Sequence, residues 1–316
     1  RGACLKKWNY EFDVPDTKKV RMIVHTDCKN EADDQFALAH HLMTPKFIVK
    51  GIIGGHFNIN PQEWGEGNTA RASVDEINKV LSLMGVSGEY RVDEGAGYPV
   101  KDEETPMPSA GAELIIEEAM KEDSHPLYVA AQGGLTDIAS AILMKPEIIS
   151  RMTIIWIGGA QYPEGGFEFN LMQDIAAANV IMKSKVELWQ IPMNVYKQMA
   201  VSLAELQKKV MPCGEIGNYL FRQMVEFNNK LAHIPHWPHG EMWGLGDSPT
   251  IGVLMEESEK TYVFDMMRAP TIAYKTMKYS FDNNNRSIRV YNQVNARLTL
   301  EDFFAKLSIN FPPERP

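Results

Sequence analysis

The stretch KVRMIVHTDCKNEADDQFALAHHLM, residues 19–43, contains the pattern that decides the fold. Its first part, residues 19–25, is a short apolar run rich in valine and isoleucine, which is typical of a buried strand. Its last part, residues 33–43, repeats apolar side chains at three- and four-residue spacings and closes before Pro45, which predicts a helix. The stretch therefore predicts a strand that leads through a polar, acidic loop into a helix.

The same alternation of strand and helix continues along the chain. Further strands are predicted at residues 47–54, 127–131, 152–158 and 186–191, and further helices at 68–84, 136–144 and 174–182. Such alternation predicts the α/β class, with an open, mostly parallel, Rossmann-like sheet and helices on both faces. No repeat, low-complexity tract or Gly/Ser-rich linker divides the sequence, so we expect a single domain over residues 1–316. Ligands of such sheets bind beyond the carboxyl ends of the strands.

Composition narrows the classes of partner. The 316 residues are 44% hydrophobic and 23% charged, and the formal net charge is -9 without a run of lysine or arginine. This argues against nucleic acid or an anionic membrane surface as a partner. The most apolar windows are much shorter than the roughly 20 residues of a membrane-spanning helix, so no span is predicted.

Cysteine usage bears on the compartment. The three cysteines, Cys4, Cys28 and Cys213, fit neither a disulfide framework nor a structural zinc cluster. A reducing, cytoplasmic location is the simpler interpretation, and export stays open because the sequence starts at Arg1 rather than at methionine.

The loop between the first strand and the first helix carries the strongest chemical signal. Asp27, Glu31, Asp33 and Asp34 are four acidic residues within eight positions, and they would repel one another unless they are solvated or bound to a cation. Hard oxygen ligands suit Ca²⁺ or Mg²⁺, although the loop lacks the EF-hand pattern. Helix capping is the alternative, and it accounts for Asp33 and Asp34 but not for Asp27.

Two weaker motifs follow other predicted strands. The segment QGGLTD, residues 132–137, contains paired glycines, which allow either a close backbone approach to a ligand or an ordinary tight turn. Glu168 and Asn170 have the chemistry to hydrogen-bond vicinal hydroxyls, but such a pair is common on any protein surface.

A last motif, WGLGDSP at residues 243–249, places Asp247 before an apolar helix, where capping is the simplest explanation on its own. His233, His236 and His239 precede it. Their spacing does not fit a helical zinc pair and prolines separate them, so we expect them to line a loop.

Taken together and in order, these motifs resemble the inosine-uridine-preferring nucleoside hydrolase family from Val20 to Leu300. The first stretch looks like the N-terminal aspartate motif of a divergent branch with an NEADD core. The matching stretches are VHTDCKNEADDQFAL at 24–38, GIIGGHFN at 51–58, VAAQGGLTDIA at 129–139, WIGGAQYPEGGFEFNLMQDIAAA at 156–178 and GDSPTIGVL at 246–254.

The resemblance implies the nucleoside hydrolase fold and hydrolysis of the N-glycosidic bond of ribonucleosides. The ribose contacts that it implies are Asp33, His56, Glu168 and Asn170, with His56 standing where many members carry an asparagine. The Ca²⁺ ligands that it implies are the side chains of Asp27, Asp34 and Asp247 and the backbone carbonyl of Gln132. A hard divalent ion can bind ribose hydroxyls and a water and lower the pKa of that water. Asp27 would then be the general base.

Three features depart from the family pattern. The separation of Asp27 from Asp33 is longer than in the commonest motif, so it stays open whether Asn30 or Glu31 joins the metal ligands. His25 stands where many members carry an aspartate. Gly246 stands where many members carry a histidine that protonates the leaving base.

The proton donor is therefore open among Trp243, His239 and protonation of the substrate in solution, and a riboside with a good leaving group needs none. Base preference is undetermined. By resemblance alone, a homodimer or homotetramer is expected.

Two other functions remain open on the residues. One is a ribose- or nucleoside-binding module without turnover, which the missing histidine before Asp247 keeps in consideration. The other is a Mg²⁺-dependent phosphohydrolase, which is disfavoured because its Asp-x-Asp-x-Thr loop would need a second aspartate after Asp27.

Overall fold

The computed structural model describes residues 8–58, 63, 65–256 and 263–313, and an eight-stranded sheet forms its centre. The strands are β1 (Val20–Thr26), β2 (Phe47–Gly54), β3 (Val92–Glu94), β4 (Leu127–Gln132), β5 (Met152–Ile157), β6 (Glu187–Ile191), β9 (Phe264–Arg268) and β12 (Ser287–Tyr291). Their order across the sheet is β3-β2-β1-β4-β5-β6-β12-β9. All neighbours are parallel except β9, which runs antiparallel to β12 at one edge.

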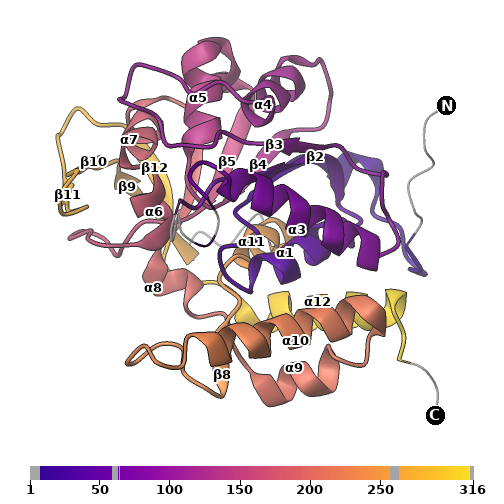
Figure 1. The fold of residues 1–316 in the computed structure, drawn as a ribbon. Coiled ribbons are helices and arrows are strands. Elements are labelled where there is room, and N and C mark those ends of the chain that lie inside the picture. The colour runs from indigo at the N-terminus through magenta and orange to yellow at the C-terminus, as the bar shows by residue number, and fades with distance from the viewer. Residues whose placement is uncertain (1–7, 59–62, 64, 257–262, 314–316) are drawn as a thin grey trace.

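Helices cover both faces of this sheet (Figure 1). One face carries α4 (Ala110–Met120), α5 (Thr136–Met144) and α7 (Ile175–Lys183). The other carries α1 (Asp34–Leu42), α3 (Thr69–Leu83), α11 (Pro249–Met255) and α12 (Ala296–Asn310), together with α9 (Leu203–Lys209) and α10 (Gly214–Lys230). The predicted α/β class is thus confirmed. Within the described residues, no helix is long and apolar enough to cross a membrane.

Shorter elements complete the chain. They are η1 (Asp16–Lys18), η2 (Pro146–Ser150), α6 (Phe169–Gln173), α8 (Met193–Tyr196), and the two-stranded pairs β7 (Ala200–Ser202) with β8 (Met242–Gly244) and β10 (Thr271–Ile272) with β11 (Tyr279–Ser280). Every strand and helix predicted from the sequence is present, and no predicted end differs from the observed one by more than one residue.

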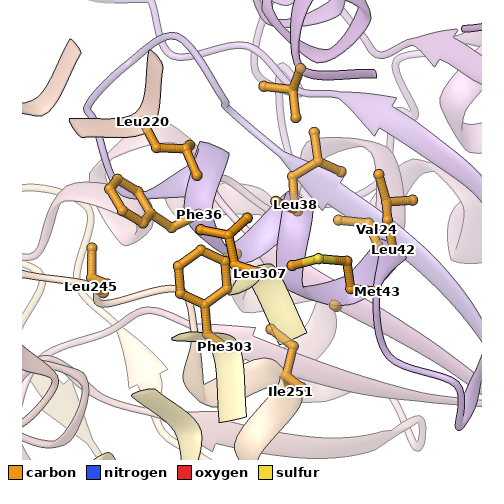
Figure 2. Packing of buried hydrophobic residues seen from close by; sticks show 14 of the residues in the cluster. Val24, Phe36, Leu38, Leu42, Met43, Leu220, Leu245, Ile251, Phe303 and Leu307 are labelled. Atoms are coloured by element: carbon orange, nitrogen blue, oxygen red, sulfur yellow. The ribbon is translucent and has the colours of Figure 1, made fainter. Parts of the chain in front are cut away.

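The helix that follows the acidic loop is enclosed by the core. All residues of α1 are buried, because its apolar side chains face the sheet on one side and α12 on the other. Phe36 of α1 meets Phe303 of α12 edge-on, with ring centroids 5.8 Å apart, and Leu38 and Leu307 lie close by in the same cluster (Figure 2). Burial of each such side chain stabilises the fold by about 1.5–3 kcal/mol. The start of α1 is therefore held on a rigid support.

The strand order reverses at β1, and this reversal defines a crevice. From β1 the chain crosses through α1 to β2 on one side, whereas β4 on the other side is followed by α5 on the opposite face. The crevice beyond the carboxyl ends of two such strands is where open α/β sheets bind ligands. The backbone links the two strand ends here, since the amide of Asp27 donates to the carbonyl of Gln132 at 3.3 Å.

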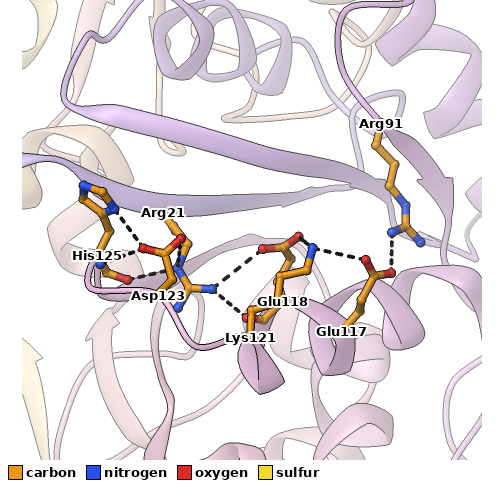
Figure 3. A network of polar contacts seen from close by, with 7 residues as sticks. All are labelled: Arg21, Arg91, Glu117, Glu118, Lys121, Asp123 and His125. Atoms are coloured by element: carbon orange, nitrogen blue, oxygen red, sulfur yellow. Dashed lines mark hydrogen bonds and ion pairs between the residues drawn. The ribbon is translucent and has the colours of Figure 1, made fainter. Parts of the chain in front are cut away.

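The amino end of β1 is tied down by a separate polar network (Figure 3). The guanidinium of Arg21 is buried and donates to the carbonyls of His125, at 2.9 Å, and Glu118, at 2.6 Å. It also lies 3.7 Å from the carboxylates of Glu118 and Asp123. This network joins β1 to α4 at the end of the strand away from the crevice.

Candidate active site

Three carboxylates converge beyond the end of β1. Oxygen atoms of Asp33, Asp34 and Asp247 lie within 4.8 Å of one another, and all three side chains are buried. Asp33 and Asp34 stand at the start of α1, and Asp247 lies two residues before α11. Asp27 follows β1 directly, and its carboxyl group interacts electrostatically with that of Asp34. The fold thus gathers the four aspartates that the sequence analysis selected.

Burial dominates the electrostatics of this cluster. It raises the pKa of Asp27 well above its usual range, and the negative charges of Asp34, Asp33 and Glu31 raise it further. The pKa of Asp247 is raised for the same reasons, burial first. Burial also raises the pKa of Asp34, but only to about 6, because hydrogen bonds from Thr26 and other neighbours oppose it. A bound cation would remove the mutual repulsion and leave the group ionised.

The residues present fit a hard divalent cation. Asp27 Oδ2 is buried and has no hydrogen-bond partner in the described part of the chain. The Gln132 carbonyl accepts from the Asp27 amide at 3.3 Å. A carbonyl oxygen has two lone pairs, so it can accept this bond and also bind an ion. Carboxylate and carbonyl oxygens are the ligands that Ca²⁺ prefers. Asp33 belongs to the group of three carboxylates whose oxygens lie within 4.8 Å of one another, and Asp27 is not part of that group, so the Asp33 carboxylate has access to the position of an ion held by Asp34 and Asp247.

Glu168 and Asn170 lie beyond the end of β5 and are fixed by hydrogen bonds. Glu168 caps α6 and accepts from the amides of Gly159, at 2.7 Å, and Leu171, at 2.9 Å. The amide of Asn170 adds a third bond, and its side-chain nitrogen donates to the Ile157 carbonyl at 2.8 Å. Burial raises the pKa of Glu168, although these hydrogen bonds oppose the shift.

His56 is part of a buried polar chain. Its Nε2 lies 2.7 Å from the hydroxyl of Thr136, which donates to Asp174 at 2.6 Å, and its Nδ1 lies 3.0 Å from the side-chain nitrogen of Asn58. Burial lowers the pKa of His56 to about 4, so the ring is neutral at pH 7. With Asn58 donating, His56 carries its proton on Nε2. Both ring nitrogens therefore already have protein partners.

Tyr196 lies between Glu168 and Gly246 and contacts both. It ends α8, after β6, and its hydroxyl donates to Glu168 at 2.8 Å. Its ring borders Gly246, where an added Cβ would lie 3.1 Å from Tyr196 Cδ2 and 3.4 Å from Asp33 Oδ2. Tyr196 is not among the site residues predicted from the sequence. Its place just beyond a predicted strand end was the available signal, because such ends line the crevice.

Glu31 lies in the loop between β1 and α1 and forms a hydrogen bond with Trp243. Its Oε1 accepts from the indole Nε1 of Trp243 at 3.2 Å. Burial raises the pKa of Glu31 to about 7, the charge of Asp34 adds to the rise, and Trp243 and Lys197 oppose it. The amide of Asn30 donates to the Asp27 carbonyl, which closes the turn. His233, His236 and His239 are exposed, as expected for a loop.

The fold and site geometry define a doubly wound α/β protein with an acidic ligand crevice at its strand-order reversal. Comparison with known proteins identifies the family to which this fold and site belong. The model of the inosine-uridine preferring nucleoside hydrolase family matches residues 22–301, and the chain belongs to that family. The enzyme class predicted from the resemblance, a nucleoside N-ribohydrolase, is confirmed at the level of the family.

Individual relatives are distant in sequence. The pyrimidine-specific ribonucleoside hydrolase RihA of Salmonella paratyphi A is 21% identical over 238 residues, which is 71% of this chain and 74% of the relative. The inosine-uridine preferring nucleoside hydrolase of Leishmania major is 25% identical over 134 residues, 41% of this chain and 42% of the relative.

Solved structures confirm the nucleoside hydrolase fold. A purine-preferring ribonucleoside hydrolase from Gardnerella vaginalis superposes with a TM-score of 0.73 at 18% identity, covering 91% of this chain and 98% of that one. A plant nucleoside hydrolase superposes with a TM-score of 0.70 at 14% identity, covering 93% and 99%.

Proposed function

We propose that this chain hydrolyses the N-glycosidic bond of ribonucleosides, with Ca²⁺ bound by Asp27, Asp34, Asp247 and the Gln132 carbonyl and with Asp27 as the general base. The observation that carries the proposal is the convergence of buried carboxylates at the strand-order reversal. Membership of the nucleoside hydrolase family favours hydrolysis of an N-glycosidic bond over hydrolysis of a phosphate ester. Purine-preferring and pyrimidine-specific relatives are both similar to the chain, so base preference is left to experiment.

The ion would supply two things when bound: it would hold the ribose hydroxyls and lower the pKa of a water. The protein supplies the rest. The unpartnered Oδ2 of Asp27 accepts the proton of the attacking water as the water oxygen bonds to C1'. The bond from C1' to the base nitrogen breaks, and its electron pair leaves with the base.

Charge at the sugar is stabilised by the same side chains. Positive charge develops on C1' and the ring oxygen, as in glycosidases, where flanking carboxylates stabilise it. Asp33 and Glu168 would do this and orient ribose. Asp33 is held by its position at the start of α1, and Glu168 is held by hydrogen bonds, before substrate enters. Preorganised groups of this kind lower the barrier without rearranging during the reaction.

The test is the release of free ribose from a panel of purine and pyrimidine ribonucleosides, with Ca²⁺ present and after chelation. We expect turnover that chelation abolishes and Ca²⁺ restores. Asp27→Asn should lower kcat by about 10²–10⁴-fold. The matched control is Asp282→Asn, which makes the same chemical change at an exposed position and should leave kcat unchanged.

The other outcomes are distinct. Turnover that survives complete chelation, or an Asp27→Asn variant with full activity, would refute the metal or the base assignment respectively. Binding of ribonucleosides without release of ribose would instead favour the binding module. Release of phosphate from phosphate monoesters would favour the phosphohydrolase.

A further inference from the structure

The side chain of Gln132 leaves one polar atom without a partner. Gln132 ends β4 and is fully buried, and its Nε2 donates to the hydroxyl of Thr250 at 2.9 Å and to the backbone carbonyl of Asp247 at 3.3 Å. Its Oε1 is buried and accepts no hydrogen bond from the residues that the structure describes. The reverse orientation of the amide would set Oε1 against the Asp247 carbonyl oxygen, which cannot donate. A buried acceptor in this state lowers the stability of a fold unless another group satisfies it.

This oxygen lies beside the acidic cluster. Gln132 and Thr26 are partners in the parallel pair of β4 and β1, so their side chains point to the same face of the sheet. On that face the Thr26 hydroxyl donates to Asp34, and the Gln132 amide donates to the Asp247 carbonyl. Asp34 and Asp247 are two of the three residues whose carboxylate oxygens lie within 4.8 Å of one another. The Gln132 side chain is therefore next to the segments that carry these carboxylates.

The two hydroxyl groups beside this amide have other acceptors. Thr26 donates to Asp34 and Thr250 donates to the Asp247 carbonyl, while the ionised carboxylates of the cluster can only accept. A second buried acceptor without a partner, Asp27 Oδ2, stands at the neighbouring strand end. A cation is the ligand that carboxylates and an unpartnered amide oxygen can share. Ca²⁺ takes about six to eight oxygen ligands, and a neutral amide oxygen adds to that number without adding negative charge.

We propose that Oε1 of Gln132 is a further ligand of the bound Ca²⁺, in addition to the backbone carbonyl of the same residue. The inference rests on the Ca²⁺ site of the proposed function. Two features carry it: the buried oxygen has no partner, and the amide nitrogen is fixed to the backbone of Asp247. Gln132 then links Asp247 to the ion, because its nitrogen holds the backbone of Asp247 while its oxygen binds the metal.

The experiment counts the water molecules bound to the ion. Tb³⁺ serves as a probe in place of Ca²⁺, and its luminescence decay in H₂O and in D₂O gives the number of bound waters. Gln132→Met removes the side-chain oxygen and keeps the backbone carbonyl, so a water should take the free position and the number should rise by about one. Calorimetry should show that the Kd for Ca²⁺ rises on the order of 10-fold. Gln132→Asn, which withdraws the oxygen by one methylene group, should give the same changes and serves if Gln132→Met does not fold.

Two control variants separate ligation from support of the fold. Gln190→Met makes the same change at a buried glutamine of β6 whose amide is satisfied, because it donates to the Gly158 carbonyl at 2.9 Å and accepts from Tyr162 at 2.8 Å. Thr250→Val removes a hydrogen bond to the Asp247 carbonyl and leaves Gln132 Oε1 in place. Both variants should leave the number of bound waters unchanged.

The outcomes of the water count are distinct. An unchanged number in Gln132→Met would overturn the inference even if Ca²⁺ bound more weakly, because the side chain would then act through the position of Asp247. An equal rise in either control would overturn it as well. In both cases the Ca²⁺ site of the proposed function would stand. If the wild type bound neither Ca²⁺ nor Tb³⁺, the proposed site itself would fall, and this inference with it.

Discussion

His25 Nε2 lies 2.8 Å from Asp137 Oδ2, and this contact ties the end of β1 to the first turn of α5. The other oxygen of Asp137 accepts from the amide of Ala96, at 2.8 Å, and the hydroxyl of Ser109, at 2.6 Å. The buried Asp137 carboxylate thus joins α5 to the end of β1 and to the segments that contain Ala96 and Ser109. Its partner on β1, His25, stands two residues before Asp27. The histidine at position 25, a departure from the family pattern, has its own buried partner.

Replacing Asp137 by Asn should destabilise the protein. Burial alone would raise the pKa of Asp137, but hydrogen bonds from His25, Ser109 and Ala96 outweigh it and the pKa is lowered. An Asn side chain presents an NH₂ group to these donors, so the free energy of unfolding should fall by about 1–3 kcal/mol at pH 7. Urea unfolding measures this, with the exposed Asp282→Asn as control.

The pH dependence of that loss has a definite sign. A lowered folded-state pKa stabilises the protein above the unfolded value of 3.8, and this stabilisation disappears as pH falls towards the folded value. The difference between the wild type and Asp137→Asn should therefore narrow below pH 3.8. An equal difference at all pH values would contradict the charge-based explanation.

Calcium should stabilise the protein more at high pH than at low pH. The metal-free protein binds protons at Asp34, whose pKa is about 6, and at Glu31, whose pKa is about 7, against ordinary values of 3.8 and 4.5. Raised folded-state values mean that ionising these groups destabilises the metal-free fold as pH rises from about 4 to 7. Ca²⁺ competes with those protons and relieves the repulsion.

The measurement is the Ca²⁺-induced rise in Tm at pH 5 and at pH 8, which we expect to be small and large respectively. The buried histidines His40, His41 and His56, with pKa values of about 4, 3 and 4, weaken the fold in acid with or without Ca²⁺. They therefore cancel in this difference. A Ca²⁺ effect that is equal at both pH values would count against the carboxylate cluster as the binding site.

Much of the fold and of the site could be predicted because the pattern was local. The apolar run before Asp27 and the three- and four-residue spacing after Asp33 each specify one element, and strand-to-helix alternation then places their ends on one edge of the sheet. That rule brought Asp27 and Gln132 together, and the structure confirms that they are linked through the backbone.

What could not be predicted depends on contacts between distant segments. Tyr196 contacts Glu168 and borders Gly246, two positions separated in sequence from it and from each other. Its place after the end of β6 was the one local signal, and that signal does not predict these contacts. The capping explanation for Asp247 was equally consistent with the sequence. Only the folded chain shows its carboxylate beside Asp33 and Asp34.

Arg21→Ala should destabilise the fold without altering the active site. The variant leaves the buried Glu118 carboxylate without the Arg21 guanidinium and removes two hydrogen bonds (Figure 3). Loss of one partner of a buried pair typically costs about 3–5 kcal/mol. Arg151→Ala removes a solvent-exposed pair with Glu122 and should leave stability nearly unchanged. Chemical denaturation compares them, and a comparable loss for the two variants would refute the structural importance of the buried network.

Gly133→Ala should weaken Ca²⁺ binding while leaving the fold intact. A Cβ at this position would lie 3.2 Å from Asp27 Cγ and 3.3 Å from its Oδ2, so Asp27 would have to move by a few tenths of an ångström. Gly244→Ala is the matched control, because its Cβ would meet no atom within 4 Å. Displacing a ligand in this way should raise the Kd for Ca²⁺ on the order of 10-fold, measured by calorimetry alongside Tm of the chelated protein. The Tm of the chelated form reports the fold alone. If that Tm is unchanged and the Kd for Ca²⁺ rises, Asp27 binds the ion. If both the Tm and the Kd are unchanged, Asp27 does not bind the ion.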